Sequence, residues 1–341
     1  MNLRTLFSLI VFVAVISVPA ALAQDATPDG AMVYSYPIEL PPGLGGLTPN
    51  VSLEYNSMSG NSLLGVGFRL GGLSAITRDQ SYGINFTEGD HFLIDGQRLF
   101  KTSDGMYHTE RESFELIECV GDPNDTSSHW VVTAKNGTKL YYGYNLDEHD
   151  TTNDGRIEAV GMDGKALVWA LSRVEDANGN YYTIDYLEDA TEGDYYPTKI
   201  EYTKNGYNSS LKTHAVYFSY EPRTDATVLY LPTPFKMDMR LKWITVKTDE
   251  QLVRKYRLDY DIGDSTQRSL LNVIQEYGND GSAPYWPDAG AYAPGTGEKT
   301  LPPVTFDWSA GDIVYEPQES HVITDFKMKE VSDKIADFNG D

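Results

Sequence analysis

The chain has 341 residues, with 27 Lys and Arg against 50 Asp and Glu, and so a formal net charge of −23. Such an acidic surface repels nucleic acid and anionic lipid headgroups, and no basic stripe offsets it, so neither is expected as a partner. Cys119 is the single cysteine, which excludes an internal disulfide and leaves the fold to a hydrophobic core.

Residues 1–23 have the pattern of a secretion signal. Arg4 supplies the positive charge, Leu6–Val18 are mostly apolar, and Ala21-Leu22-Ala23 is a small-x-small cleavage site. A membrane-spanning helix is the alternative, but it needs ~20 apolar residues, and no stop-transfer flank follows. No cysteine follows the site, which argues against a lipoprotein. We therefore predict a secreted, extracellular protein cleaved after Ala23, and the lack of disulfides favours a bacterial source.

The stretch Tyr34–Asp79 reads as a tightly wound series of short strands. An alternating run ends at Pro41-Pro42, and a glycine turn leads into Val51–Tyr55, whose apolar residues fall on every second position. After a polar turn, Gly65–Gly72 is predicted to return as one strand interrupted by glycines, which permit positive φ angles and close backbone approach.

The same stretch resembles a known family. The run PPGLGGLTPNVSLEYNSMSGNSLLGVGFRLGGLSAITRD contains a PPG turn, a P-x-(V/L)-x-L-x-Y-(N/D)-S strand, a GxGF/W return and an I-x-R ending, in that order. This pattern resembles the SpvB-type domain, which begins the B components of insecticidal toxin complexes, SpvB-like virulence proteins and many secreted RHS (YD-repeat) proteins. Phe68 departs from the pattern, because relatives often carry tryptophan there.

Turn signals continue along the chain. Asp95-Gly96, Asp104-Gly105 and Asn136-Gly137 have the residue types of two-residue hairpin turns between alternating runs. No window shows the apolar period of a long amphipathic helix. The sequence therefore predicts an all-β fold, a large antiparallel domain of many hairpins. Asp150–Gly155 faintly resembles a calcium loop, but its spacing is wrong, and we expect a solvated loop.

The run Trp169–Tyr186 is a second distinctive hairpin. A strand, the turn Asp176-Ala177-Asn178-Gly179-Asn180 and a returning strand place Tyr182, Ile184 and Tyr186 on one face. A metal or acid/base site would use the same acidic and amide groups. Asp and Asn also bond their own backbone while Gly supplies a positive φ, so we expect a structural turn. This hairpin resembles one found in SpvB domains and echoed in RHS/YD repeats.

Tyrosine-ended strands recur towards the C-terminus. The 24 tyrosines fit packing in large sheets, although a carbohydrate-binding platform including Trp286 would use the same residue types. Four later segments resemble SpvB segments in family order: Val216–Asp225, Arg240–Asp261, Thr266–Gly281 and Leu301–Trp308. The resemblance thus covers residues 30–310, and we place the SpvB-like domain at residues 24–315.

The last residues carry a different motif. Asp337, Asn339 and Asp341 occupy positions 1, 3 and 5 of a D-x-(D/N)-x-D calcium loop. This resembles the start of an FG-GAP/VCBS-type repeat, the blade of the β-propellers that follow the SpvB domain in this family. We predict that residues 322–341 begin such a blade with an incomplete, weak calcium site, and that the chain is the front of a longer protein. An accidental acidic tail is the alternative.

Catalytic signatures are missing from the sequence. The six histidines are scattered, and no nucleophile elbow or phosphate-binding loop occurs. Glu110-Arg111-Glu112 has the E-x-E spacing of the ADP-ribosyltransferase domain of SpvB, but we expect an exposed strand there. Cys119 is expected to be a buried strand residue and not a nucleophile. We therefore predict no catalytic or cofactor-binding residue, with calcium as the one candidate cofactor.

Three functions remain open. The resemblance implies a non-enzymatic structural front part of a secreted toxin-complex B-like or RHS-type protein, whose partners are other toxin components or later domains of its own chain. The second possibility is a secreted adhesin or carbohydrate-binding module. The third is the front part of an enzyme toxin whose catalytic domain lies beyond residue 341.

Overall fold

A computed structural model describes residues 25–125, 128–144, 155–162, 164–189, 191–207, 213–278 and 299–308. The predicted signal with cleavage at Ala23, the residue Trp286 and the predicted blade with Asp337, Asn339 and Asp341 lie outside these ranges and remain predictions. Within these ranges, no helix has the length and apolar character that crossing a membrane requires.

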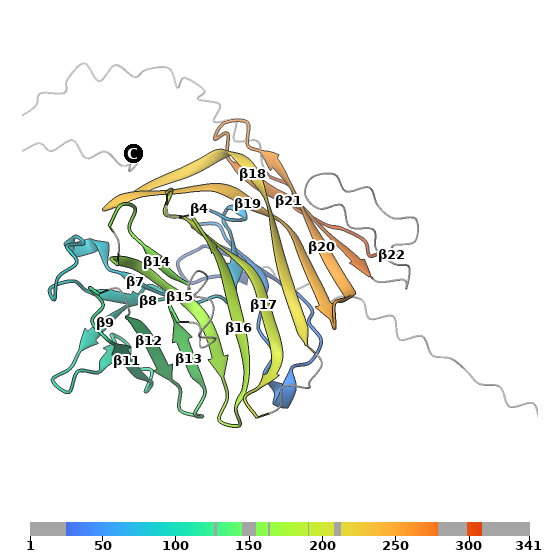
Figure 1. The fold of residues 1–341 in the computed structure, drawn as a ribbon. Helices are drawn as coiled ribbons and strands as arrows, with labels where there is room; N and C mark the ends of the chain where they lie inside the picture. Colours follow the sequence, from blue (N-terminus) through green and yellow to red (C-terminus); the bar gives the residue numbers. More distant parts are fainter. Residues whose placement is uncertain are drawn as a thin grey trace, which may run out of the picture.

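The described chain is almost entirely β, which confirms the predicted all-β class (Figure 1). Two 3-10 helices, η1 (Leu44–Gly46) and η2 (Gln80–Tyr82), interrupt it. The strands are β1 (Asp25–Ala26), β2 (Met32–Pro37), β3 (Ser52–Asn56), β4 (Asn61–Ser62), β5 (Gly65–Val66), β6 (Phe68–Gly71), β7 (Ala75–Arg78), β8 (Phe92–Ile94), β9 (Gln97–Lys101), β10 (Tyr107–Thr109), β11 (Leu116–Val120), β12 (His129–Thr133), β13 (Lys139–Tyr142), β14 (Arg156–Glu158), β15 (Ala166–Glu175), β16 (Asn180–Glu188), β17 (Tyr195–Asn205), β18 (His214–Leu231), β19 (Thr233–Thr248), β20 (Gln251–Ile262), β21 (Ser269–Gly278), β22 (Lys299–Thr300) and β23 (Val304–Thr305).

Strands β7 to β13 and β15 close into a barrel. Each strand from β7 to β13 pairs antiparallel with the next, β13 pairs with β15, and β15 pairs with β7. The predicted Asp95-Gly96 turn joins β8 to β9 with φ angles of 47° and 79°, and Gly137 (φ 83°) lies between β12 and β13. These local turn signals therefore set the order of the barrel strands.

Aromatic side chains fill the barrel. Phe92, Tyr107, Trp130 and Trp169 contact one another edge to face, with ring centroids 4.8 to 6.2 Å apart. Trp130 and Trp169 are completely buried. Burying a large apolar side chain contributes about 1.5–3 kcal/mol, and each aromatic pair of this geometry adds about 0.5–1.5 kcal/mol. The barrel is thus a densely packed, aromatic part of the hydrophobic core.

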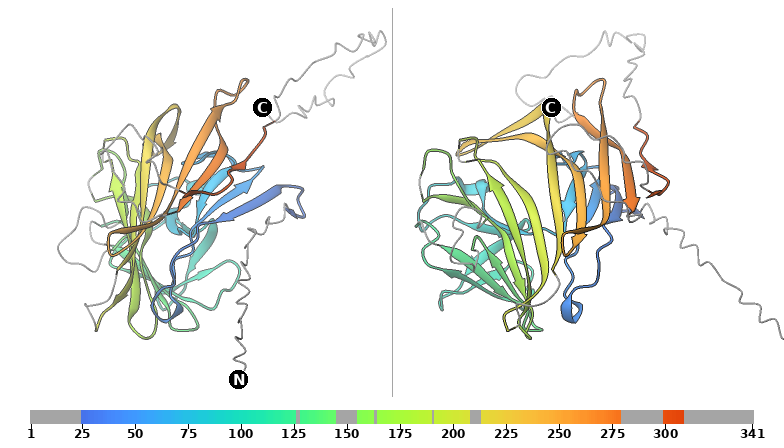
Figure 2. Two further views of the ribbon diagram at one scale, coloured as in Figure 1. Left: turned by 90° about the vertical axis from the view of Figure 1, so that its right-hand side faces the viewer. Right: turned by 45° about the vertical axis from the view of Figure 1, so that its right-hand side comes forward.

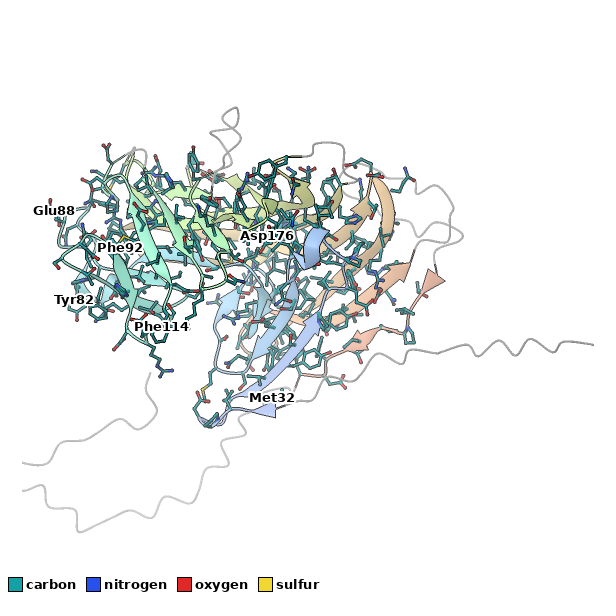
Figure 3. All side chains as sticks on the ribbon, turned by 90° about the horizontal axis from the view of Figure 1, so that it is seen from below. Met32, Tyr82, Glu88, Phe92, Phe114 and Asp176 are labelled. Atoms are coloured by element: carbon teal, nitrogen blue, oxygen red, sulfur yellow. The ribbon has the colours of Figure 1, made fainter. Side chains whose placement is uncertain are left out.

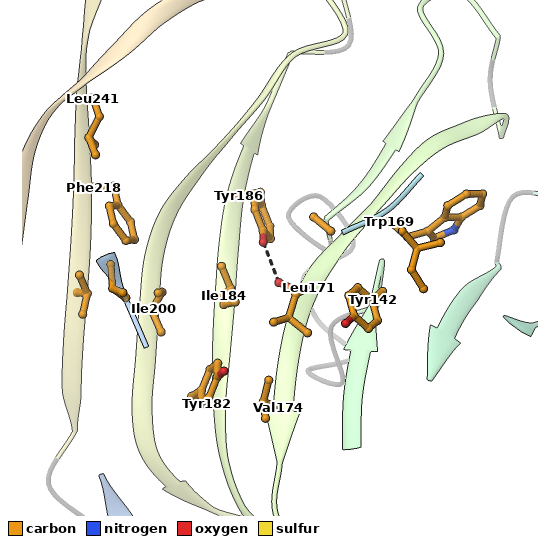
Figure 4. Packing of buried hydrophobic residues seen from close by; sticks show 14 of the residues in the cluster. Tyr142, Trp169, Leu171, Val174, Tyr182, Ile184, Tyr186, Ile200, Phe218 and Leu241 are labelled. Atoms are coloured by element: carbon orange, nitrogen blue, oxygen red, sulfur yellow. Dashed lines mark hydrogen bonds between the residues drawn. The ribbon is translucent and has the colours of Figure 1, made fainter. Parts of the chain in front are cut away.

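Strand β15 also starts a large curved sheet. Its residues Val168–Ala170 pair with β7, whereas Arg173–Glu175 pair with β16. From β16 the pairing continues in chain order to β21, which carries β22 and β23. The predicted face of Tyr182, Ile184 and Tyr186 is buried in this sheet, beside β15 (Figure 4).

The N-terminal strands form a small second layer. Strands β1, β2, β3 and β6 pair in that order and lie against the C-terminal part of the large sheet (Figure 2). Tyr36 contacts Tyr256 with centroids 6.1 Å apart, and Phe68 contacts Phe306 at 5.0 Å. Phe68, the residue that departs from the family pattern, is therefore an interlayer core residue.

The single strand predicted for Gly65–Gly72 is wrong. It divides at Gly67 (φ 78°) into β5, which pairs with β4, and β6, which pairs with β3. The glycines also serve close contacts, since a Cβ on Gly72 would lie 1.4 Å from the Asn50 carbonyl oxygen. The adjacent strands β5 and β6 therefore belong to two different sheets.

Candidate functional site

The turn at residues 176–180 is built by its own side chains. Asp176 Oδ1 accepts the backbone N–H groups of Asn178 (2.8 Å) and Asn180 (2.9 Å), and its Oδ2 accepts the Asn180 side-chain amide at 2.7 Å. Burial alone would raise the pKa of Asp176, but these hydrogen bonds outweigh it and hold the pKa below its ordinary value. Gly179 has φ 77°. The carboxylate is thus used within the turn, as predicted.

This turn meets the glycine loop of the first motif. A Cβ on Gly45 would lie 2.7 Å from Asn180 Nδ2, so a side chain at position 45 would displace the Asn180 amide. Asp176 lies beside η1 (Figure 3). Asn205 donates its amide to Asn180 Oδ1 at 2.8 Å, and Tyr202 donates its hydroxyl to the Pro41 carbonyl at 3.1 Å. The two family-like motifs are therefore one structural junction.

Of the other candidate residues, the Glu110-Arg111-Glu112 motif and Cys119 lie within the described ranges. Glu110 and Glu112 are exposed, as expected, but lie in the loop between β10 and β11, which corrects the predicted strand. Cys119 lies on the face of β11 that also carries the buried Ile117 and packs against the core, but it is half-buried and not fully buried. Desolvation raises the pKa of its thiol to about 12, which disfavours the reactive thiolate. In the described ranges, no three His, Cys, Asp or Glu residues are grouped to hold a metal.

Two arginines whose carboxylate partners are buried with them are charged clusters that the sequence does not predict. The first is Arg78, which ends the I-x-R motif on β7 and has a fully buried side chain. Its Nη1 donates to Asp90 Oδ2 at 2.7 Å, its Nε to the Ala166 carbonyl at 2.8 Å and its Nη2 to the Pro123 carbonyl at 2.6 Å. These bonds tie two loops, the one before β8 and the one between β11 and β12, to β7 and β15.

Aromatic rings surround the Arg78 guanidinium. Its carbon lies 4.8 Å from the ring centroid of Phe86, 5.3 Å from that of Phe92 and 5.5 Å from that of Trp169. Asp90 in turn accepts the backbone N–H of Phe86 at 2.9 Å, at a residue with the uncommon φ of 55°. Cation–π contact and the ion pair offset part of the desolvation of the charge, which still lowers the pKa of Arg78.

The second buried arginine is Arg223, in an irregular part of β18. The pairing with β19 shifts between Pro222 and Thr227, and this bulge turns Arg223 and Asp225 inward. Arg223 binds Asp225 through two nitrogens, Nε to Oδ1 at 2.9 Å and Nη2 to Oδ2 at 2.8 Å.

Further partners complete the Asp225 cluster. The Ser269 backbone N–H and hydroxyl each donate to Asp225 at 2.7 Å, and Asn61 accepts from Arg223 Nη2 at 2.6 Å. Burial opposes ionisation of Asp225, but the bonds from Arg223 and Ser269 prevail and hold its pKa far below the ordinary range. The cluster fastens β4, β18 and β21 to one another.

Sequence signals for both arginines existed but were not specific. Arg78 and Arg223 both lie in segments that carry the family resemblance. Arg223 and Asp225 are two residues apart, which places them on one face of a strand. That spacing does not reveal that the β4–β5 hairpin covers this face, and charged residues are mostly exposed in proteins.

Comparison with known proteins agrees with this geometry. Residues 26–110 match the family model for SpvB, the Salmonella virulence plasmid 65kDa B protein. The solved N-terminal domain of effector protein SpvB from Salmonella typhimurium strain LT2 superimposes with a TM-score of 0.59 and 16% identity, over 72% of this chain and 98% of that domain. The chain has the SpvB N-terminal fold.

The SpvB fold also occurs in larger toxins. The crystal structure of TcdB2-TccC3 matches with a TM-score of 0.64 and 18% identity, and the Tc holotoxin pore of Photorhabdus luminescens with 0.66 and 19%. Each covers 84% of this chain, which spans 16% of the toxin chain's length. A comparison with curated protein sequences gave no match.

We predict that Gly179→Val destabilises the protein by about 1–2 kcal/mol, because a β-branched residue is strained at the left-handed φ of this position. The matched control is Gly206→Val, where a Cβ meets nothing within 4 Å and the φ is not in that region. Thermal unfolding of both variants is the measurement. Abolition of an activity by Asp176→Asn at unchanged Tm would show that the turn is a functional site.

We predict that Asp225→Asn costs about 3–5 kcal/mol of unfolding free energy, because it removes one partner of a buried ion pair. Since the folded-state pKa of Asp225 is depressed, its stabilisation is present above the unfolded pKa near 3.8 and is lost as pH falls below that value. Urea unfolding from pH 7 to pH 3 tests both statements.

The matched control for Asp225 is Asp259→Asn. Asp259 is half-buried and pairs with Lys242 and Arg257, each at 3.0 Å, on the same sheet. Ion pairs that solvent reaches contribute about 0.2–1 kcal/mol, so Asp259→Asn should lower the unfolding free energy far less than Asp225→Asn. Equal effects of the two substitutions at pH 7 would contradict a special role for the buried cluster.

Proposed function

We propose that this chain is the non-enzymatic structural front part of a larger secreted protein of the toxin-complex B or RHS type, which acts in toxin delivery as part of a shell or scaffold. The observation that carries the proposal is the coverage of the structural likeness. Most of this chain matches a small fraction of the TcdB2-TccC3 chain and nearly the whole solved SpvB N-terminal domain.

The inward direction of the buried charges supports a scaffold over an enzyme. Arg78 with Asp90 and Arg223 with Asp225 are bonded to backbone groups and neighbouring strands inside the body. A catalytic pair needs groups that reach a substrate. An enzyme toxin with this chain at its front would carry its catalytic residues beyond residue 341.

The tyrosines favour the scaffold over a glycan-binding module. Among the tyrosines whose side chains are described, Tyr82 and Tyr207 are the exposed ones, and Arg98 lies over the Tyr82 ring at 4.9 Å. Most of the others pack in the core, such as Tyr186, whose hydroxyl donates to the Leu171 carbonyl at 2.8 Å. A sugar platform requires several neighbouring exposed rings.

Expression of the complete open reading frame, followed by analysis of the secreted protein, tests export and assembly together. We expect secreted material to begin at Gln24, as N-terminal sequencing would show, and to elute in an assembly or longer polypeptide well above 38.0 kDa. Elution as a free chain of this mass would overturn the scaffold role. Transfer of labelled ADP-ribose that Glu110→Gln abolishes at unchanged Tm would instead place an enzyme here.

Calcium binding belongs to the same proposal. Asp337, Asn339 and Asp341 supply at most three side-chain ligands, whereas calcium takes six to eight oxygens. We expect a weak calcium site in this chain and a much stronger one in a chain extended through the next repeat, because the added residues would supply further oxygen ligands. Calcium that binds the folded form raises its stability, so binding is visible as a higher Tm. Melting of both chains with calcium and with chelator measures it. Equal Tm values in all four samples would show an acidic tail.

A further inference from the structure

The longest hairpin of the molecule reaches across its neighbours. Strands β18 and β19 remain paired to their turn, from Thr227 opposite Met237 to Leu231 opposite Thr233, and we call residues 227–237 the arm. In Figure 1 the arm extends above β14. The backbone N–H of Lys236 donates to the Glu192 carbonyl at 3.0 Å, so the arm rests on the turn between β16 and β17.

One tyrosine hydroxyl joins this turn to the base of the arm. Tyr196, at the start of β17, donates its hydroxyl hydrogen to Asp194 Oδ2. The hydroxyl oxygen of Tyr196 also accepts the backbone N–H groups of Asp238 at 3.2 Å and Met239 at 3.3 Å, both on β19. Tyr196 and Asp194 are both buried, so water does not compete for these bonds.

The Asp194 carboxylate has an incomplete environment. The residue is 3% exposed, and its Oδ1 is buried without a hydrogen-bond partner among the described residues. The nearby cation Lys236 is already engaged, with Glu192 at 2.7 Å and Asp238 at 3.3 Å. A buried carboxylate with one donor is poorly compensated when ionised.

The groups that face Asp194 come from three elements. Asp189 and Glu192 lie on its own turn, Asp238 lies on β19, and each disfavours the negative charge. Tyr196 of β17 is the opposing donor, and the Tyr220 ring of β18 packs on it with centroids 5.1 Å apart. Burial and these carboxylates together raise the pKa of Asp194 above its ordinary value of 3.8.

We propose that Asp194 and Tyr196 form a proton-responsive joint that holds the arm firmly when Asp194 is protonated and less firmly when it is ionised. A carboxyl that titrates higher in the folded state binds its proton on folding. Its full contribution is therefore present below the unfolded pKa and is lost as pH rises through the folded value. The arm is then held more tightly in mildly acidic medium than in neutral medium, a property independent of the scaffold role.

The test compares the wild-type full chain with Asp194→Asn between pH 4 and pH 8. Asn is uncharged and still accepts the Tyr196 hydrogen bond. We expect the variant to melt about 2–4 °C above the wild type at pH 8 and at the same temperature near pH 4. A Tm difference that does not change with pH, or a variant that is less stable at pH 8, would overturn the proposal. Asp264→Asn, an exposed aspartate between β20 and β21 that is not among the groups facing Asp194, is the control and should show no such trend.

Two further measurements test the joint without the Asp194→Asn variant. Carbon-13 NMR of the Asp194 carboxyl in the wild type should show titration above the ordinary range, and an ordinary value would overturn the joint. Tyr196→Phe removes the bridging hydroxyl, so the amides of Asp238 and Met239 should exchange with solvent at least tenfold faster at every pH. Unchanged exchange would show that the hydroxyl does not hold the arm.

Discussion

Strand β15 is the element on which both halves of the molecule depend, because it pairs with four other strands. Strands β13 and β14 share one of its edges, while β7 and β16 share the other. Trp169, Ala170 and Leu171 are consecutive residues of β15, and all three are buried, so both faces of the strand are covered. A strand covered on both faces must be a nearly continuous apolar run, which is the character of residues 166–172. Barrel and sheet are thus one cooperative body and not two joined units.

Buried ion pairs hold those parts of the chain that the apolar core does not reach. Arg78 fixes a loop over the barrel interior, and Arg223 fixes the β4–β5 hairpin against β18 and β21. Such pairs add little net stability compared with apolar residues of the same volume, but they permit one arrangement because any other leaves a charge unpaired. The charges therefore specify loop positions, while burial of the aliphatic and aromatic core residues stabilises the fold.

The sequence could predict what is local and could not predict which surfaces meet. The all-β class, the Asp95-Gly96 hairpin and the bonding within the Asp176 turn follow from nearest neighbours in the chain, and the structure confirms them. The division of residues 65–72 between two sheets depends on distant partners, as does the burial of Arg223 and Asp194. The half-burial of Cys119 likewise depends on how completely distant residues cover the inward face of β11. Alternation reveals two faces of a strand, but it does not reveal what covers each one.

The contacts of the small N-terminal layer have a consequence for the order of folding. Tyr36 and Phe68 are synthesised early, yet their partners Tyr256, Phe306 and Trp308 are more than half the chain away. The first strands therefore remain without their apolar cover until the last ones have left the ribosome. Contacts of such long sequence separation slow folding, because loop closure precedes the gain from burial. The small layer is therefore expected to be the last part of the molecule to reach its native packing, and its apolar faces stay accessible to other chains until then.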